Sequence, residues 1–185
     1  MAVEEERIIS RDCPATVVPS GEAVTLPEGS KVKITHRLGG NFTVIWDYGM
    51  ARIERENADA LGEQVLPVTP AQANRSVKHQ GPPDESAIWE QLKTVFDPEI
   101  PVNIVDLGLV YSLNVKKEGN DNYNVNVTMT LTAAGCGMGP VIAEDAKSKM
   151  CDVPGVGEAN VELVWDPPWN QGMISEEGKM QLGLI

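Results

Sequence analysis

Residues 67–83 form a proline-containing stretch that separates two patterned parts of the sequence. They contain four prolines and show no hydrophobic periodicity of the helical or the strand type. Proline fixes φ and removes a backbone hydrogen-bond donor, so this composition is typical of a linker. The sequence therefore predicts two domains, a small module at residues 1–66 and a second domain at residues 84–185, joined by the linker at 67–83.

The two halves also differ in charge. Residues 1–80 hold 11 acidic and 9 basic side chains (net −2), whereas residues 81–185 hold 16 acidic and 6 basic ones (net −10). A pI near 4.5 disfavours binding to nucleic-acid phosphates or to an anionic membrane surface. No apolar stretch reaches the ~18 to 20 residues that cross a bilayer, and the acidic first residues lack a signal-peptide core. We expect a cytoplasmic protein with no nucleic-acid or membrane partner.

The first half has the pattern of a small all-β module. Short apolar runs at residues 23–26, 31–35, 42–46 and 50–53 are separated by glycine-containing turn clusters. Close spacing of this kind is typical of a β meander. A module of this size buries little apolar surface, so we expect it to depend on the second domain or on a partner for stability.

The second half begins with a helical pattern. Asp84 follows two prolines and can cap a helix in which Ile88, Leu92 and Val95 share one face. Pro98 restricts the residue before it, so the helix is expected to end at Asp97.

Strand patterns follow this helix. Residues 109–115 and 123–131 predict a hairpin, and the polar stretch between them supplies the turn. Pro140 favours the first position of a second helix, and residues 159–165 predict a third strand. The fold class is therefore α/β: a two-layer α-β-β-α-β sandwich preceded by the small all-β module.

The three cysteines, Cys13, Cys136 and Cys151, stand far apart in the sequence. No Cys-x-x-Cys pair is present, which excludes a zinc finger or a cluster held by four local thiolates. A disulfide scaffold does not suit a reducing compartment. Three free thiols remain, and for Cys151 core packing is the better interpretation.

Cys136 lies in a loop flanked by Gly135 and Gly137, between a strand end and a helix start. Free backbone N–H groups and the helix dipole favour a thiolate there, and glycines leave the sulfur sterically open. This is the setting of a nucleophile or of a soft-metal ligand. The alternative is a tight turn that holds Cys136 as a small buried hydrophobic residue.

Three segments of the second half carry a family resemblance: DPEIPVNIVDLGLVY at 97–111, TLTAAGCGMG at 130–139 and DPPW at 166–169. Together they resemble the metal–sulfur cluster biosynthesis domain, a small α/β domain found in iron–sulfur assembly factors. The first half, with RDCP at 11–14, VTLPEG at 24–29 and LGG at 38–40, is similar to the extension found in SufT proteins. The resemblance covers nearly the whole chain.

The resemblance implies carboxylate neighbours for Cys136. Glu99 and Asp106 match the family motif, and a thiolate beside one or two carboxylates suits Fe²⁺ bound weakly and reversibly. The alternatives are a solvated Glu99 and an Asp106 that caps the turn at residues 107–108.

The resemblance also draws attention to Thr130, Thr132 and Trp169. Strand alternation places both threonines on the polar face, where a hydroxyl could bond the Cys136 sulfur or cap its loop. Ordinary β propensity explains a threonine in a strand equally well. Trp169 is either an anchor for a partner or, the better interpretation, part of the edge of the core.

Cys13 matches the RDCP segment of the SufT-like extension. That match implies a second metal ligand acting with Cys136, within one chain or across a homodimer. The alternative is a core cysteine or a thiol in a flexible tail.

The resemblance implies an accessory factor in iron–sulfur cluster assembly or delivery that acts by binding and transfer, without enzymatic turnover. Its cargo would be transient iron or an iron–sulfur cluster, with no cofactor tightly bound. Its partners would be assembly scaffold proteins and client apo-proteins. A carrier must release its cargo, so an incomplete ligand set that a partner completes is physically suitable.

Two other functional classes remain open from the sequence. The first is a thiol-dependent enzyme with Cys136 as its nucleophile, although no histidine lies near it in sequence to act as a base. The second is an interaction scaffold in which the β module binds partners and Cys136 has no chemical role.

Overall fold

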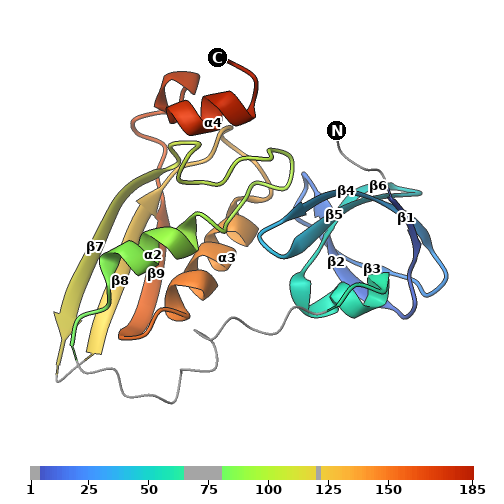
Figure 1. Cartoon of the computed structure of the whole chain (residues 1–185), viewed down its shortest axis with the longest axis horizontal. Coiled ribbons are helices and arrows are strands. Elements are labelled where there is room, and N and C mark those ends of the chain that lie inside the picture. The colour runs from blue at the N-terminus through green and yellow to red at the C-terminus, as the bar shows by residue number, and fades with distance from the viewer. Residues whose placement is uncertain (1–4, 65–80, 120–121) are drawn as a thin grey trace. The chain divides into compact units, whose positions relative to one another are not determined.

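The computed structural model describes residues 5–64, 81–119 and 122–185 (Figure 1). The chain divides into two compact units, Met1–Pro67 and Val68–Ile185. Most of the linker expected at 67–83 lies outside the described residues. Within them, no helix is both long and apolar enough to cross a membrane.

The first unit is a six-stranded antiparallel sheet with the strand order β1-β4-β5-β6-β2-β3. A 3₁₀ helix, η1, follows the last strand. The elements are β1 (Glu5–Ile8), β2 (Cys13–Val18), β3 (Ala23–Leu26), β4 (Lys31–Leu38), β5 (Asn41–Trp46), β6 (Gly49–Ile53) and η1 (Arg55–Leu61).

The observed strand order corrects part of the sequence prediction. β4, β5 and β6 do form a meander, and the β4–β5 turn uses Gly39 and Gly40 with φ of 60° and 86°, as a two-residue hairpin requires. However, β1 pairs with β4, and β2 lies between β6 and β3. Neither β1 nor β2 was predicted, so the sheet is larger than the four expected strands.

Apolar side chains from these strands form one buried cluster. Ile34, Val44 and Ile53 are almost fully buried on neighbouring strands, and Leu61 of η1 packs into the same cluster. Cys13, the first residue of β2, also lies there with no exposed surface. The β module therefore has a core of its own.

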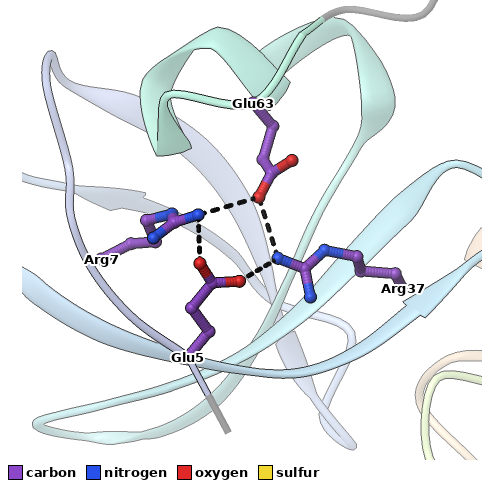
Figure 2. Close-up of polar contacts among 4 residues, drawn as sticks. All are labelled: Glu5, Arg7, Arg37 and Glu63. Carbon is purple, nitrogen blue, oxygen red and sulfur yellow. Dashed lines mark hydrogen bonds and ion pairs between the residues drawn. The ribbon is translucent and has the colours of Figure 1, made fainter. Parts of the chain in front are cut away.

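Four charged side chains form an ion-pair network on this unit (Figure 2). The Arg37 guanidinium lies 2.6 Å from a Glu5 carboxylate oxygen and 2.8 Å from a Glu63 one. Arg7 also contacts both carboxylates. The network joins β1 and β4 to the segment after η1. It gives β1, which offers little apolar surface, additional contacts with the rest of the unit.

The second unit has the element order α-β-β-α-β that the sequence predicted, followed by two short helices that it did not. The elements are α2 (Glu85–Leu92), β7 (Val110–Glu118), β8 (Asn122–Met129), α3 (Gly139–Cys151), β9 (Val156–Leu163), η3 (Gln171–Met173) and α4 (Glu176–Gln181). The unit is therefore mixed α/β.

β8 is the central strand of a three-stranded sheet, antiparallel to β7 and parallel to β9. Val125, Val127 and Met129 of β8 are buried, whereas the side chains between them are partly exposed. Figure 1 shows α2 and α3 on the same side of this sheet. The predicted apolar stripes are buried in both helices, at Ile88 and Leu92 in α2 and at Ile142, Ala146 and Met150 in α3.

Several element boundaries differ from the prediction. Asp84 caps α2 as expected, by accepting a hydrogen bond from the Ser86 amide, but the helix ends at Leu92 instead of Asp97. β8 ends at Met129, two residues early, and β9 starts at Val156, three residues early. Because β8 is shorter, residues 130 and 131 belong to the connection that leads to the Cys136 loop.

Candidate functional site

Three segments meet at one end of the three-stranded sheet. Met129, the last residue of β8, pairs with Val110 at the start of β7 and with Leu163 at the end of β9. The segments 97–109, 130–138 and 164–185 therefore all enter or leave the sheet at this end. These are the segments that carry the three family-like motifs, so the fold brings the motifs together.

Backbone hydrogen bonds hold these segments to one another beyond the strands. The Thr130 amide donates to the Leu109 carbonyl at 2.9 Å, and the Val164 amide donates to the Met129 carbonyl at 2.8 Å. The connection to the Cys136 loop is thus fastened on both sides.

The Cys136 loop is a compact turn between β8 and α3. The Cys136 amide donates to the Ala133 carbonyl at 3.3 Å, and the Gly139 amide donates to the Cys136 carbonyl at 3.1 Å. Gly135 has a φ of +85°, a left-handed conformation that favours glycine. Residues 133–135 are exposed and Cys136 is half-buried, so the thiol lies at the edge of a solvent-facing loop.

Gly139 allows the first turn of α3 to approach the segment that follows β8. A Cβ at this position would lie 2.6 Å from the Leu131 Cδ1 atom, closer than packed carbon atoms allow. Gly139 therefore has a packing role at the start of α3.

Asp106 is bound on both carboxylate oxygens by its own chain. Its Oδ2 accepts from Asn103 Nδ2 at 2.6 Å, and its Oδ1 accepts from the Ser175 hydroxyl at 2.8 Å. The turn at residues 103–106 is organised by Asn103, whose Oδ1 accepts from the amides of Val105 and Asp106. Asn103, and not Asp106, therefore supplies the side-chain acceptor for the amides of this turn. The Asp106 carboxylate, which the alternative interpretation had capping the turn at 107–108, instead links two distant segments.

Trp169 and Tyr111 contact the same region. The Trp169 indole N–H donates to the Leu107 carbonyl at 2.7 Å, and the Tyr111 hydroxyl donates to the Pro167 carbonyl, also at 2.7 Å. Trp169 is half-buried. Its polar atom is bound within the chain, in agreement with the interpretation of Trp169 as an edge of the core.

The other predicted neighbours of Cys136 differ in exposure. Glu99 is exposed, and its amide donates to Asp97 Oδ1 at 3.0 Å. Thr132 is half-buried in the connection. Thr130 is only 1% exposed, so its placement on a polar strand face is wrong: β8 has ended before it, and the alternation no longer applies.

Cys13 is 0% exposed in the core of the first unit. Burial raises the pKa of the Cys13 thiol, because the low-dielectric interior disfavours the thiolate. Cys151 is half-buried at the end of α3. Within residues 5–64, 81–119 and 122–185, no group of three or more His, Cys, Asp or Glu side chains is placed to hold a metal ion.

Sequence reasoning missed Ser175 and Asn103. Ser175 caps α4, since its hydroxyl accepts from the Gly178 amide at 3.0 Å. A serine followed by Glu176 and Glu177 is a recognisable helix start, so the cap could have been found. Its bond to Asp106 has no local signal in the sequence.

Comparison with known proteins places the chain in a family. The family described as iron-sulfur cluster assembly protein matches residues 85–163. An Fe-S protein maturation auxiliary factor of Porphyromonas gingivalis is 46% identical over 101 residues, which cover 55% of this chain and 92% of that protein. The chain belongs to this family of iron-sulfur cluster assembly proteins. The family resemblance of the second half is therefore confirmed.

Other proteins match about half of this chain with similar sequence identity. The Fe-S protein maturation auxiliary factor SufT of Staphylococcus aureus is 43% identical over 90 residues, which cover 49% of this chain and 98% of that protein. A crystal structure of a domain of unknown function from Bacillus anthracis is 40% identical with a TM-score of 0.47, covering 55% of this chain and 92% of that one. The family match lies within the second unit, so the similarity of the β module to the SufT extension stays a prediction.

Proposed function

We propose that this protein is an accessory factor in iron–sulfur cluster assembly or delivery, and that it acts by binding and transfer through the Cys136 thiol. Relatives in the same family carry the names of Fe-S protein maturation auxiliary factors. The observation that carries the proposal is the position of Cys136, a half-buried thiol in a solvent-facing loop, at the sheet end where the three family motifs meet.

A single accessible thiol suits a carrier better than a storage site. One thiolate holds Fe²⁺, a borderline-soft ion, weakly enough for release. Glu99, whose carboxylate is exposed on the segment leading to β7, can contribute as a second, weak ligand. A scaffold protein or a client apo-protein would supply the remaining ligands, and the cargo would move to the partner with the more complete set.

We infer that the second unit is a two-layer α-β-β-α-β sandwich, in which the helices support one face of the sheet and the site lies at one end. In this view the protein works in the cytoplasm without catalytic turnover. Cys13 can join Cys136 as a ligand only if the β module opens, since its sulfur is buried.

Anaerobic reconstitution with ferrous iron and sulfide tests the thiol directly. The wild-type chain should develop visible absorbance that a chelator removes readily, as expected for weakly held iron. Cys136→Ser should lose most of this absorbance, whereas Cys151→Ser, a matched change of another half-buried thiol, should keep it. Equal absorbance in the wild-type and Cys136→Ser chains would contradict the assignment of Cys136.

A further inference from the structure

The chain crosses the end of the sheet after β9. β9 lies on one side of β8, and β7 lies on the other. Residues 164–178, here named the strap, leave β9 and make hydrogen bonds to Asp106, Leu107 and Tyr111, which lie in β7 or in the segment entering it. The strap therefore passes the end of β8, where the Cys136 loop emerges, and Figure 1 shows α4 beyond these strand ends.

Asp106 provides the central fastening of the strap. Its backbone carbonyl accepts from the Ser175 amide at 2.8 Å, in addition to the bond between its carboxylate and the Ser175 hydroxyl. Asn103 donates to the other carboxylate oxygen. This bond orients the Asp106 carboxylate that accepts from the Ser175 hydroxyl. A charged acceptor makes the stronger kind of hydrogen bond.

Two glycines allow the strap to lie close against its seat. A Cβ on Gly108 would lie 2.2 Å from the Met173 carbonyl oxygen, and one on Gly178 would lie 2.9 Å from the Asp106 carbonyl oxygen. Both contacts are with backbone atoms, which cannot move aside as a flexible side chain can. The strap is thus fitted to the segment that carries Asp106.

Few strap residues are buried in the core. Ile174 is 4% exposed and Gly178 is buried, whereas residues 165–168 and 170–172 are exposed. A segment held mainly by hydrogen bonds and one apolar anchor opens at a lower free energy than a central strand.

We propose that the strap closes the end of the sheet beside the Cys136 loop and partly shields its half-buried thiol, and that Asp106 is the positioning residue that fastens the strap. Opening of the strap then controls how readily Cys136 reacts with a partner. This inference does not depend on the nature of the cargo, and it gives Asp106 a role distinct from that of a metal ligand.

Thiol alkylation of the full-length protein tests the strap. Iodoacetamide labelling, followed peptide by peptide by mass spectrometry, gives a separate rate for each cysteine. Asp106→Asn and Ser175→Ala should each raise the Cys136 rate several-fold and leave buried Cys13 unlabelled. Ser86→Ala, which removes a comparable hydroxyl–carboxylate bond at the start of α2, is the matched control and should leave the Cys136 rate unchanged.

Hydrogen exchange of the unmodified protein keeps the proposal testable if a variant fails to fold. The amides of Ser175 and Gly178 should exchange through an opening that leaves the β8 amide of Val127 protected. If the amides of Ser175, Gly178 and Val127 all exchanged with the same free energy of opening, the proposal would be overturned, because the strap would then open only when the whole unit unfolds. An unchanged Cys136 rate in folded Ser175→Ala would overturn it as well.

Discussion

The hydroxyl of Ser175 donates a 2.8 Å hydrogen bond to Oδ1 of Asp106, 69 residues away in the sequence. This bond ties the segment that follows β9 to the segment that precedes β7. The carboxylate expected from the sequence to face Cys136 is thus occupied by two side chains of its own unit. Asp106 thereby holds two segments at this end of the sheet together.

Replacing Gly108 by alanine should destabilise the second unit more than a comparable change elsewhere. Gly108 and Gly119 have nearly the same φ, +70° and +69°, but only the Gly108 Cβ would meet another atom, the Met173 carbonyl. Gly119→Ala should cost about 1–2 kcal/mol from the left-handed backbone alone. Gly108→Ala should cost roughly 1–3 kcal/mol more because the strap must move.

Urea unfolding of both variants measures this difference. Hydrogen exchange should show faster exchange of the strap in Gly108→Ala and not in Gly119→Ala. Equal unfolding free energies for the two variants would mean that the strap is not closely packed against Gly108.

The β module should lose stability in acid through the network of Figure 2. The hydrogen bond from Arg37 holds the pKa of Glu5 below its usual value of 4.5. A carboxyl group with a lowered pKa stabilises the folded state above its unfolded pKa, and this contribution disappears as the pH falls through the folded pKa.

Hydrogen exchange of β4 amides at pH 7 and at pH 3 to 4 would reveal this loss. Glu5→Gln, which cannot titrate, should show a smaller change between the two conditions than the wild-type protein does. An identical pH dependence in both would show that Glu5 contributes nothing to acid sensitivity.

The sequence correctly predicted those parts of the fold that have a capping residue or a regular spacing of apolar residues. The α2 cap at Asp84 and the buried stripes of α2 and α3 follow from a capping residue and helical spacing. β1 escaped prediction because Glu5, Glu6 and Arg7 give it no apolar alternation, and ion pairs with distant residues support it instead.

β2 escaped prediction for a different reason. Pro14 would interrupt a strand paired on both sides, since proline cannot donate a backbone hydrogen bond. In the structure β2 pairs with β3 over residues 13–16 but with β6 only over residues 16–18. Pro14 therefore lies where the strand is paired on one side.

The place of the Cys136 loop in the fold was predictable, whereas the contacts of the residues around it were not. The cysteine loop could be placed at a strand end from glycine and proline signals near Cys136. The hydrogen-bond partner of Asp106 could not be predicted, because nothing within residues 97–111 indicates that Ser175 will contact it.

Cys13 should react with iodoacetamide only after the β module unfolds. Its sulfur lies in the core and burial raises its thiol pKa, so both access and thiolate content are low. Labelling in native buffer and in urea compares the two states. If Cys13 is labelled in native buffer as fast as Cys136, it is available to act as a second ligand, and its assignment to the core is wrong.

Residues 81–185 should fold without the β module, since we propose that the two units are independent domains. The lengths of the relatives support this expectation. The match of 101 residues covers 92% of the Porphyromonas gingivalis protein, and the match of 90 residues covers 98% of the Staphylococcus aureus protein. Circular dichroism and urea unfolding of a truncated chain should show a cooperative transition. Aggregation, or loss of cooperativity, would indicate that the two halves share one core.

The exposed position of the Cys136 loop predicts that Cys136→Ser changes the unfolding free energy by no more than about 0.5 kcal/mol. The most direct test of function is therefore the activity of an iron–sulfur enzyme in cells that lack this protein and depend on it. Wild-type and Cys151→Ser chains should restore that activity, and Cys136→Ser, present at the same level, should not. Full restoration by Cys136→Ser would contradict transfer through the Cys136 thiol.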